Sequence, residues 1–291
     1  MNISTKILTV DLEDWFHILD NEETADPTAW SKFDSRVEKS TKKLLALFDE
    51  HHVKATFFVL GWIAQEFPEL VREIRVRGHE IACHSHLHQL VYTQTVAEFE
   101  KDLIRATEAI ESACGVRPTA YRAPGFSITN SEQWAFHVLS EQGYSIDCSV
   151  FPAVRAHGGL PNFPSSGPCI LENSNGTTLI SMPINVKKVF NNKIIYSGGG
   201  YFRLFPFWAL KHLFRSCPYV MTYFHPRDFD PDQPMVPGLS IARKFKSYIG
   251  LSRSTMKLKG LLSELEFLTL FEATERYANG NNQLQKIKLD N

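Results

Sequence analysis

The sequence predicts an α/β protein in which parallel strands form the interior and helices cover them. Short runs rich in β-branched and aromatic residues alternate with longer segments that have the apolar period of amphipathic helices. A chain of 291 residues, 43% of them hydrophobic, can bury one substantial core. Polar residues directly follow several strand-like runs, as expected where parallel strands end at a functional edge.

The first half of the chain supplies a regular alternation of strands and helices. The segment 95–115 illustrates the helical pattern, because apolar residues recur near every third or fourth position and Gly115 can end the helix. In chain order we expect strand 6–12, helix 35–50, strand 54–61, helix 67–78, strand 79–83, helix 95–115, strand 119–125, helix 130–143 and strand 144–150.

The second half is less regular. Proline and glycine accumulate between about 152 and 200, which predicts a loop-rich insertion with one strand at 178–185. A helix at 207–217, a strand at 218–226 and a C-terminal helix at about 254–278 follow, and the tail 281–291 is expected to be frayed. No repeat or linker marks a boundary, so we expect a single domain over 1–291.

Composition narrows the partners and the compartment. The formal net charge of −1 gives no basic surface for nucleic acid. Five scattered cysteines without a CxxC pair suit reduced thiols, and the N-terminus lacks signal-peptide features, so we expect a cytoplasmic protein. No apolar stretch reaches 18 residues, although the basic, aromatic segment 201–215 could make a peripheral contact with the inner membrane.

The stretch CHSHLH at 83–88 has the spacing of a metal site. His84 and His88 lie four residues apart just after an expected strand, and catalytic zinc takes three protein ligands plus water. A third ligand is available where the first strand ends, at Asp11-Leu12-Glu13-Asp14. Strand alternation places Asp11 and Glu13 on one face, whereas Asp14 could turn inward, so Glu13 and Asp14 remain alternative ligands.

Three further strand ends carry ionisable groups. Arg122 is a permanent cation that can hold a carboxylate. His225 follows a largely apolar run and could act as a general acid, and Asp147 ends another strand. A carboxylate that accepts a hydrogen bond from one ring nitrogen raises the pKa of an imidazole and fixes its tautomer.

The ordered segments VDLEDWFH, GHEIACHSHLH, RAPGF, DCS and FHP resemble the five motifs of the NodB-homology polysaccharide deacetylases, carbohydrate esterase family 4. GGGYFRLFP and HPRDFDPDQP resemble the branch associated with bacterial surface-polysaccharide gene clusters. The resemblance covers about residues 6–235. It implies a distorted (β/α)7 barrel that uses a divalent metal, most plausibly Zn²⁺, to hydrolyse N-acetyl groups of amino sugars.

The resemblance also implies roles for individual residues. His84 and His88 match the metal-binding histidines, and Asp11 matches the catalytic base. Arg122 matches the arginine that orients this base, while Asp147 matches the acid that tunes the catalytic histidine, His225.

The chain departs from the family pattern in two motifs. The usual adjacent aspartates are replaced by Asp-x-Glu-Asp, and Gly125 follows Pro124 where an aromatic residue is common. Candidate substrate contacts are Trp15, Pro124, Gly125 and Tyr201. The expected substrate is a nucleotide-linked or lipid-linked N-acetylated amino sugar in surface-glycan biosynthesis. The alternatives are a metal-independent cyclic amide hydrolase of the same fold and a non-catalytic carbohydrate-binding protein.

Overall fold

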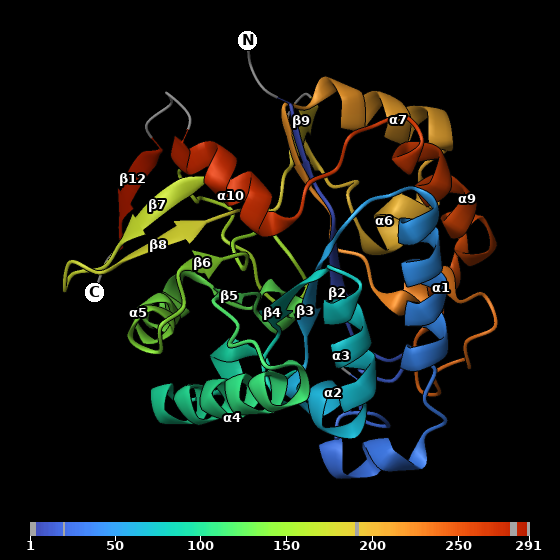
Figure 1. Ribbon diagram of the computed structural model, residues 1–291, viewed down its shortest axis with the longest axis horizontal. Coiled ribbons are helices and arrows are strands. Elements are labelled where there is room, and N and C mark those ends of the chain that lie inside the picture. Colours follow the sequence, from blue (N-terminus) through green and yellow to red (C-terminus); the bar gives the residue numbers. More distant parts are fainter. Residues whose placement is uncertain (1–3, 20, 190–191, 280–283, 290–291) are drawn as a thin grey trace.

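The structure is a computed structural model that describes residues 4–19, 21–189, 192–279 and 284–289. Its centre is an eight-stranded sheet in the order β12-β7-β8-β6-β5-β4-β3-β2, seen in Figure 1. The strands of this sheet are β2 (Thr9–Leu12), β3 (Thr56–Val59), β4 (Glu80–Cys83), β5 (Ala120–Tyr121), β6 (Ile146–Asp147), β7 (Cys169–Glu172), β8 (Thr178–Ser181) and β12 (Gln285–Lys288).

A second, short ladder extends the parallel arrangement beyond β2. The expected first strand is divided at Leu8 into β1 (Thr5–Ile7) and β2, and β1 pairs in parallel with β11 (Tyr219–Met221). Parallel pairing therefore continues from β11 through β1 and β2 to β3, β4, β5, β6 and β8. Among the described residues no ladder joins β8 to β11, so the predicted seven-stranded barrel is present in an open, distorted form.

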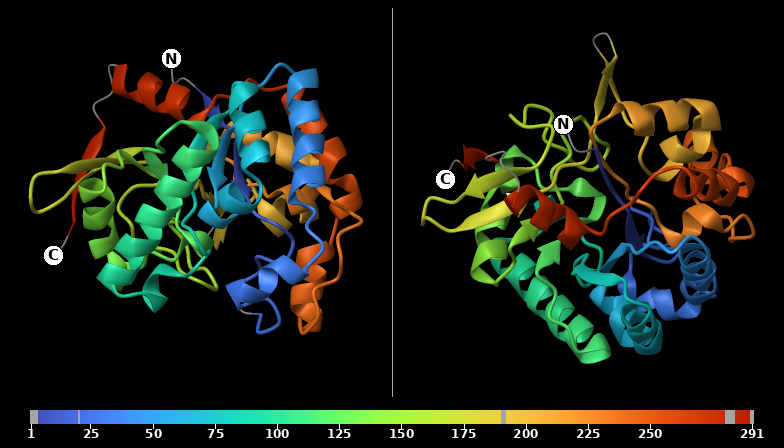
Figure 2. Two further views of the ribbon diagram at one scale, coloured as in Figure 1. Left: turned by 60° about the horizontal axis from the view of Figure 1, so that its bottom comes forward. Right: turned by 45° about the horizontal axis from the view of Figure 1, so that its top comes forward.

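Helices cover the outside of these strands (Figures 1 and 2). Helix α4 shows how the sequence defines them: a capping box of Thr95 and Glu98 begins it, and Gly115 in the left-handed conformation ends it. The helices are α1 (Val37–Glu50), α2 (Gly61–Glu66), α3 (Pro68–Val76), α4 (Val96–Cys114), α5 (Trp134–Glu141), α6 (Gly199–Leu204), α7 (Phe207–Ser216), α8 (Ile241–Tyr248), α9 (Leu251–Leu262) and α10 (Leu270–Asn279).

The C-terminal part differs from the prediction. The expected helix at 254–278 is two helices, α9 and α10, because the chain between them runs beside β1 and Leu268 exchanges backbone hydrogen bonds with Lys6 and Leu8. The tail is not frayed where the structure describes it, since β12 pairs with β7 and buries Ile287. Residues 281–283 and 290–291 of the tail lie outside the described residues.

The segment 152–200 contains more regular structure than expected. Besides β8 it holds β7 and an antiparallel pair, β9 (Lys187–Val189) and β10 (Asn192–Ile194). Strand β7 pairs antiparallel with β8, so this segment extends the parallel sheet rather than lying over it as loops alone. The five cysteines are free.

Candidate metal centre and catalytic site

Side chains from four parallel strands meet where those strands end. Strand β2 leads to Asp11 and Glu13, β4 to His84 and His88, β5 to Arg122, and β11 to His225. The register places Asp11 opposite Phe58 of β3 and Cys83 of β4 opposite Tyr121 of β5, so the residues that follow these strands share one edge.

Glu13, His84 and His88 form a buried cluster suited to a metal ion. Glu13 Oε1 lies 3.0 Å from Nε2 of His84 and 3.0 Å from Nε2 of His88. One ligand atom from each of the three residues lies within 4.8 Å of the others. Two imidazoles and one carboxylate are a donor set of known catalytic zinc sites, so the residues present fit such an ion.

A backbone hydrogen bond orients the first histidine. His84 Nδ1 lies 2.7 Å from the backbone oxygen of Arg122, and an N–H at Nδ1 donates to it. Nε2 hydrogen-bonds to Glu13, and beside a bound ion it would instead offer its lone pair while Nδ1 keeps its proton. Burial opposes ionisation of Glu13, yet the charges of His88 and His225 and the hydrogen bonds from the two histidines keep its pKa well below the usual value.

A tight turn and a contact with α4 fix the loop that carries the two histidines. Ser85 and His88 both have positive φ, so the loop turns tightly and brings His84 and His88 to one point. Asp102 of α4 accepts hydrogen bonds from the backbone N–H groups of His86 and Leu87, at 2.8 and 3.1 Å. No sequence pattern singled out Asp102, because only the tertiary contact between α4 and this loop gives it a role.

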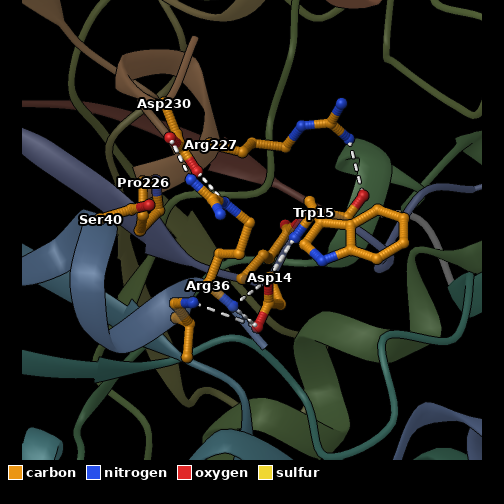
Figure 3. A pocket seen from close by; sticks show the side chains of 9 residues that line it. Asp14, Trp15, Arg36, Ser40, Pro226, Arg227 and Asp230 are labelled. Atoms are coloured by element: carbon orange, nitrogen blue, oxygen red, sulfur yellow. Dashed lines mark hydrogen bonds and ion pairs between the residues drawn. The ribbon is translucent and has the colours of Figure 1, made fainter. Parts of the chain in front are cut away.

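The structure separates the two candidate acidic ligands. Glu13 faces the histidines. Asp14 points instead to the start of α1, as Figure 3 shows. Asp14 accepts hydrogen bonds from the N–H groups of Arg36 and Val37 and from Ser35 Oγ. These donors occupy both carboxylate oxygens of Asp14. Asp14 is therefore not the metal ligand that was one of the two alternatives, and it instead stabilises the N-terminus of α1.

Asp11 is held by Arg122. The guanidinium Nη1 donates to Asp11 Oδ1 and, at 2.9 Å, to Thr9 Oγ1, and the guanidinium lies 4.0 Å from the ring centre of Phe58. Both charged side chains are buried. Oδ1 is thereby committed to Arg122, while Oδ2 faces His225, with Nε2 of that ring 3.8 Å away.

His225 lies beside both Asp11 and Glu13. Its Nδ1 hydrogen-bonds to Asp228 Oδ2 at 3.0 Å, and its Nε2 lies 3.8 Å from Glu13 Oε1. Burial opposes the charged ring, but Glu13, then Asp228 and Asp11, raise the pKa of His225 to about 9. The side chain is 22% exposed, so this charged group can meet an incoming molecule.

Asp228 is itself anchored by Arg203 of α6. Arg203 Nε lies 3.1 Å from Asp228 Oδ1, the oxygen that His225 does not use. Burial would raise the pKa of Asp228, but the charge of Arg203 and the hydrogen bond from His225 keep it below the usual value. The signal for Asp228 was present in the sequence as His-Pro-Arg-Asp, because an acid three residues after the capping residue of a turn can accept a hydrogen bond from that residue's backbone N–H.

The prediction that Asp147 is the hydrogen-bond partner of His225 is wrong, because His225 bonds to Asp228 instead. Asp147 accepts hydrogen bonds from the N–H of Ser149 at 2.9 Å and from Ser181 Oγ at 3.1 Å. It is fully buried between β5 and β8, and burial raises its pKa to about 6 against these hydrogen bonds. The turn after β11 supplies a nearer carboxylate, Asp228, and so removes the need for Asp147.

The candidate substrate contacts have different environments. Trp15 packs edge-on against Phe16 and Phe33 and donates from its indole nitrogen to the Asp34 oxygen, so its ring is core and not a stacking surface. Pro124 is buried at the start of a short 3₁₀ turn, and Tyr201 is 42% exposed on α6. Gly125 has φ +61°, and a Cβ there would lie 2.8 Å from Leu19. Glycine is therefore favoured at this position.

Two family models match parts of this chain. Residues 21–144 match the polysaccharide deacetylase family, and residues 148–275 match a domain of unknown function, DUF3473. A peptidoglycan-N-acetylglucosamine deacetylase of Bacillus cereus is 34% identical over 107 residues, 36% of this chain and 38% of that protein. A chitooligosaccharide deacetylase of Bradyrhizobium is 38% identical over 131 residues, 43% of this chain and 57% of that protein. The matched region is thus less than two thirds of these relatives.

Solved structures share the fold over nearly the whole chain. A Mycobacterium smegmatis protein described as a polysaccharide deacetylase superimposes with a TM-score of 0.58 at 22% identity, covering 91% of this chain and 93% of that one. An allantoinase superimposes with a TM-score of 0.60 at 14% identity, covering 97% and 92%. The eight-stranded sheet takes strands from both matched segments, 21–144 and 148–275.

Proposed function

We propose that this chain, whose residues 21–144 match the polysaccharide deacetylase family, is a metal-dependent hydrolase that removes N-acetyl groups from amino sugars. The observation that carries the proposal is the convergence of three units at one strand edge. These units are the cluster of Glu13 with two histidines, the pair of Asp11 and Arg122, and the pair of His225 and Asp228.

Glu13, His84 and His88 would hold the metal. A divalent ion bound there would lower the pKa of a water molecule and polarise the acetamide oxygen. Zinc is the ion we favour, because two histidines and a glutamate are one of its recurrent catalytic ligand sets.

Asp11 is placed to act as the base. Arg122 keeps one carboxylate oxygen occupied, so Asp11 Oδ2 is the oxygen that can accept the proton of the attacking water. The guanidinium and the carboxylate form a buried ion pair. Arg122 thus orients the base without contacting the substrate.

His225 is placed to act as the acid. Its Nδ1–H donates to Asp228, which fixes the ring so that Nε2–H points at the space beside Asp11 and Glu13. Protonation of the departing amine nitrogen by Nε2 completes amide cleavage and yields acetate and a free amino sugar. Asp228 stabilises the imidazolium before this transfer.

The substrate and the compartment belong to the same proposal. Two relatives are named as deacetylases of peptidoglycan and of chitooligosaccharides, and we infer an N-acetylated amino sugar as the substrate of this chain. Five free cysteines suit a reducing cytoplasm, where a nucleotide-linked or lipid-linked precursor of a surface glycan would be available.

Acetate release by the purified, metal-loaded protein tests this proposal. The substrates are nucleotide-linked, lipid-linked and oligomeric N-acetyl sugars, and elemental analysis reports the metal. Asp11→Asn and His225→Ala should each lower turnover about 10²–10⁴-fold while leaving metal content intact. His84→Ala should lose the metal itself.

Other outcomes would favour the alternatives. Hydrolysis of cyclic amides by metal-free protein would point to the metal-independent hydrolase, whose fold the allantoinase shares. Sugar binding without acetate release from any substrate would point to a non-catalytic carbohydrate-binding protein.

A further inference from the structure

Helix α8 is an amphipathic helix whose apolar residues face solvent. We propose that α8 is a docking surface for an anionic lipid membrane. None of its eight residues is buried, and Ile241 and Phe245, one turn apart on one face, are 89% and 56% exposed. In Figure 2 this orange helix lies at the edge of the molecule.

The charge around α8 fits an anionic partner. Residues 233–263 contain six Lys or Arg and no Asp or Glu, although the whole chain has a net charge of −1. Lys244 and Lys246 are exposed, and within the described part of the chain neither forms an ion pair. Basic residues beside exposed Ile and Phe are the composition of helices that lie in a membrane interface.

The apolar residues favour a bilayer over a soluble polyanion. A polyanionic glycan would be bound by the lysines alone and would leave Ile241 and Phe245 in water. A bilayer offers phosphate groups to Lys244 and Lys246 and an acyl region to the two apolar side chains. No helix among the described residues has the length and apolarity to cross a bilayer, so this contact is peripheral.

The structure points to α8 rather than to the segment 201–215 that the sequence suggested. Helix α7 in that segment exposes Trp208, which is 74% accessible. Its cations Lys211 and Arg215, however, both pair with Glu264 at 2.8 Å. Glu264 offsets part of their charge, whereas Lys244 and Lys246 of α8 form no ion pair with a described residue.

Helix α8 is tied to the catalytic site. Arg203, which anchors Asp228, also donates to the backbone oxygens of Ser247 at 2.7 Å and Lys246 at 3.1 Å. Arg243 donates to the backbone oxygen of Leu19, in the segment that follows Glu13. Docking through α8 would therefore hold the site at the membrane surface. This use for a lipid-linked substrate rests on the proposed function, while the docking itself does not.

Vesicle co-sedimentation of the full chain tests the docking surface. The vesicles are phosphatidylcholine with or without phosphatidylglycerol, at low and high ionic strength. We expect binding only to the anionic vesicles. Lys244→Glu/Lys246→Glu should weaken it about 25-fold or more, from about fivefold per lysine. Ile241→Ser/Phe245→Ser should weaken it about 10-fold or more.

Matched controls separate α8 from general surface effects. Val76→Ser removes another exposed apolar side chain and Lys39→Glu reverses another exposed lysine, and both should bind as the parent does. Turnover of a short soluble N-acetyl sugar should be unchanged in Ile241→Ser/Phe245→Ser. A parent protein that sedimented with anionic vesicles but released no acetate would contradict the proposed function and support the docking surface.

Three results would overturn the docking proposal. The first is no binding to anionic vesicles at low ionic strength. The second is equal loss of binding in the control variants, which would remove α8 as the site. The third is binding that depends on the lysines but not on the apolar residues, which would indicate a polyanion surface instead.

Discussion

The charge of Asp228 should control the pH range in which His225 works. Asp228→Asn can keep an oxygen toward His225 Nδ1, now 3.0 Å from Asp228 Oδ2, and so removes the charge more than the geometry. An opposite charge at this distance raises the pKa of an imidazole by about 1–3 units. Removal of the charge should lower the pKa of His225. Because the side chain is partly exposed, we expect the lower part of this range, about 1–2 units or about 1.4–2.7 kcal/mol.

A bound metal makes this dependence stronger. The negative charge of Glu13 is a cause of the raised pKa of His225, and a cation held by Glu13 would offset that charge. Asp228 then becomes the main support of the imidazolium. The unpaired guanidinium of Arg203 would lower the pKa of His225 further in the variant.

The assay is the pH dependence of kcat for acetate release by metal-loaded protein. The falling, alkaline limb reports the protonated acid, and it should move about 1–2 units to lower pH in Asp228→Asn. Turnover on that limb should drop about 10–100-fold, while metal content and KM change little. Asp147→Asn is the matched control and should leave the limb in place. A limb that moves in Asp147→Asn but not in Asp228→Asn would refute the reasoning.

Three further predictions concern the metal, the pH stability and the packing. Glu13→Gln should lose metal by elemental analysis, whereas Asp14→Asn should keep it but lower the unfolding free energy by about 0.5–2 kcal/mol; equal metal loss in both would contradict the assignment. Burial lowers the pKa of His79 to about 4 from 6.5, so its neutral form stabilises the fold above pH 6.5 and this stability is lost as pH falls toward 4. Between pH 7 and 5 the unfolding free energy of His79→Asn, measured in urea titrations, should fall by about 1–2 kcal/mol less than that of the parent. The same pH dependence in both proteins would argue against a role for His79. Gly61→Ala places a Cβ 2.3 Å from His86 Nδ1 and should cost about 1–3 kcal/mol in the same titrations, and a neutral result would show that His86 moves freely.

Most of the site was predictable because parallel strands end at one edge. Asp11, His84, Arg122 and His225 each follow an apolar run that can be recognised locally, and the sheet register brings such positions together. The fold class and the family resemblance were confirmed for the same reason, since the strand–helix alternation is a local pattern. What remained were two choices between acids, Glu13 or Asp14 and Asp147 or Asp228.

The sequence by itself determined which strand ends carry ionisable groups, because apolar periodicity and residue type are local properties. Only the tertiary structure decided which acid each group meets. Asp14 became a helix-capping residue because residues 35–37 approach it, and Asp228 displaced Asp147 because Arg203 of α6 holds it beside His225. A hydrogen-bond partner is chosen by distance in space, and residues 21 positions or more apart, such as Asp14 and Ser35 or Arg203 and Asp228, gain that proximity only when the chain packs.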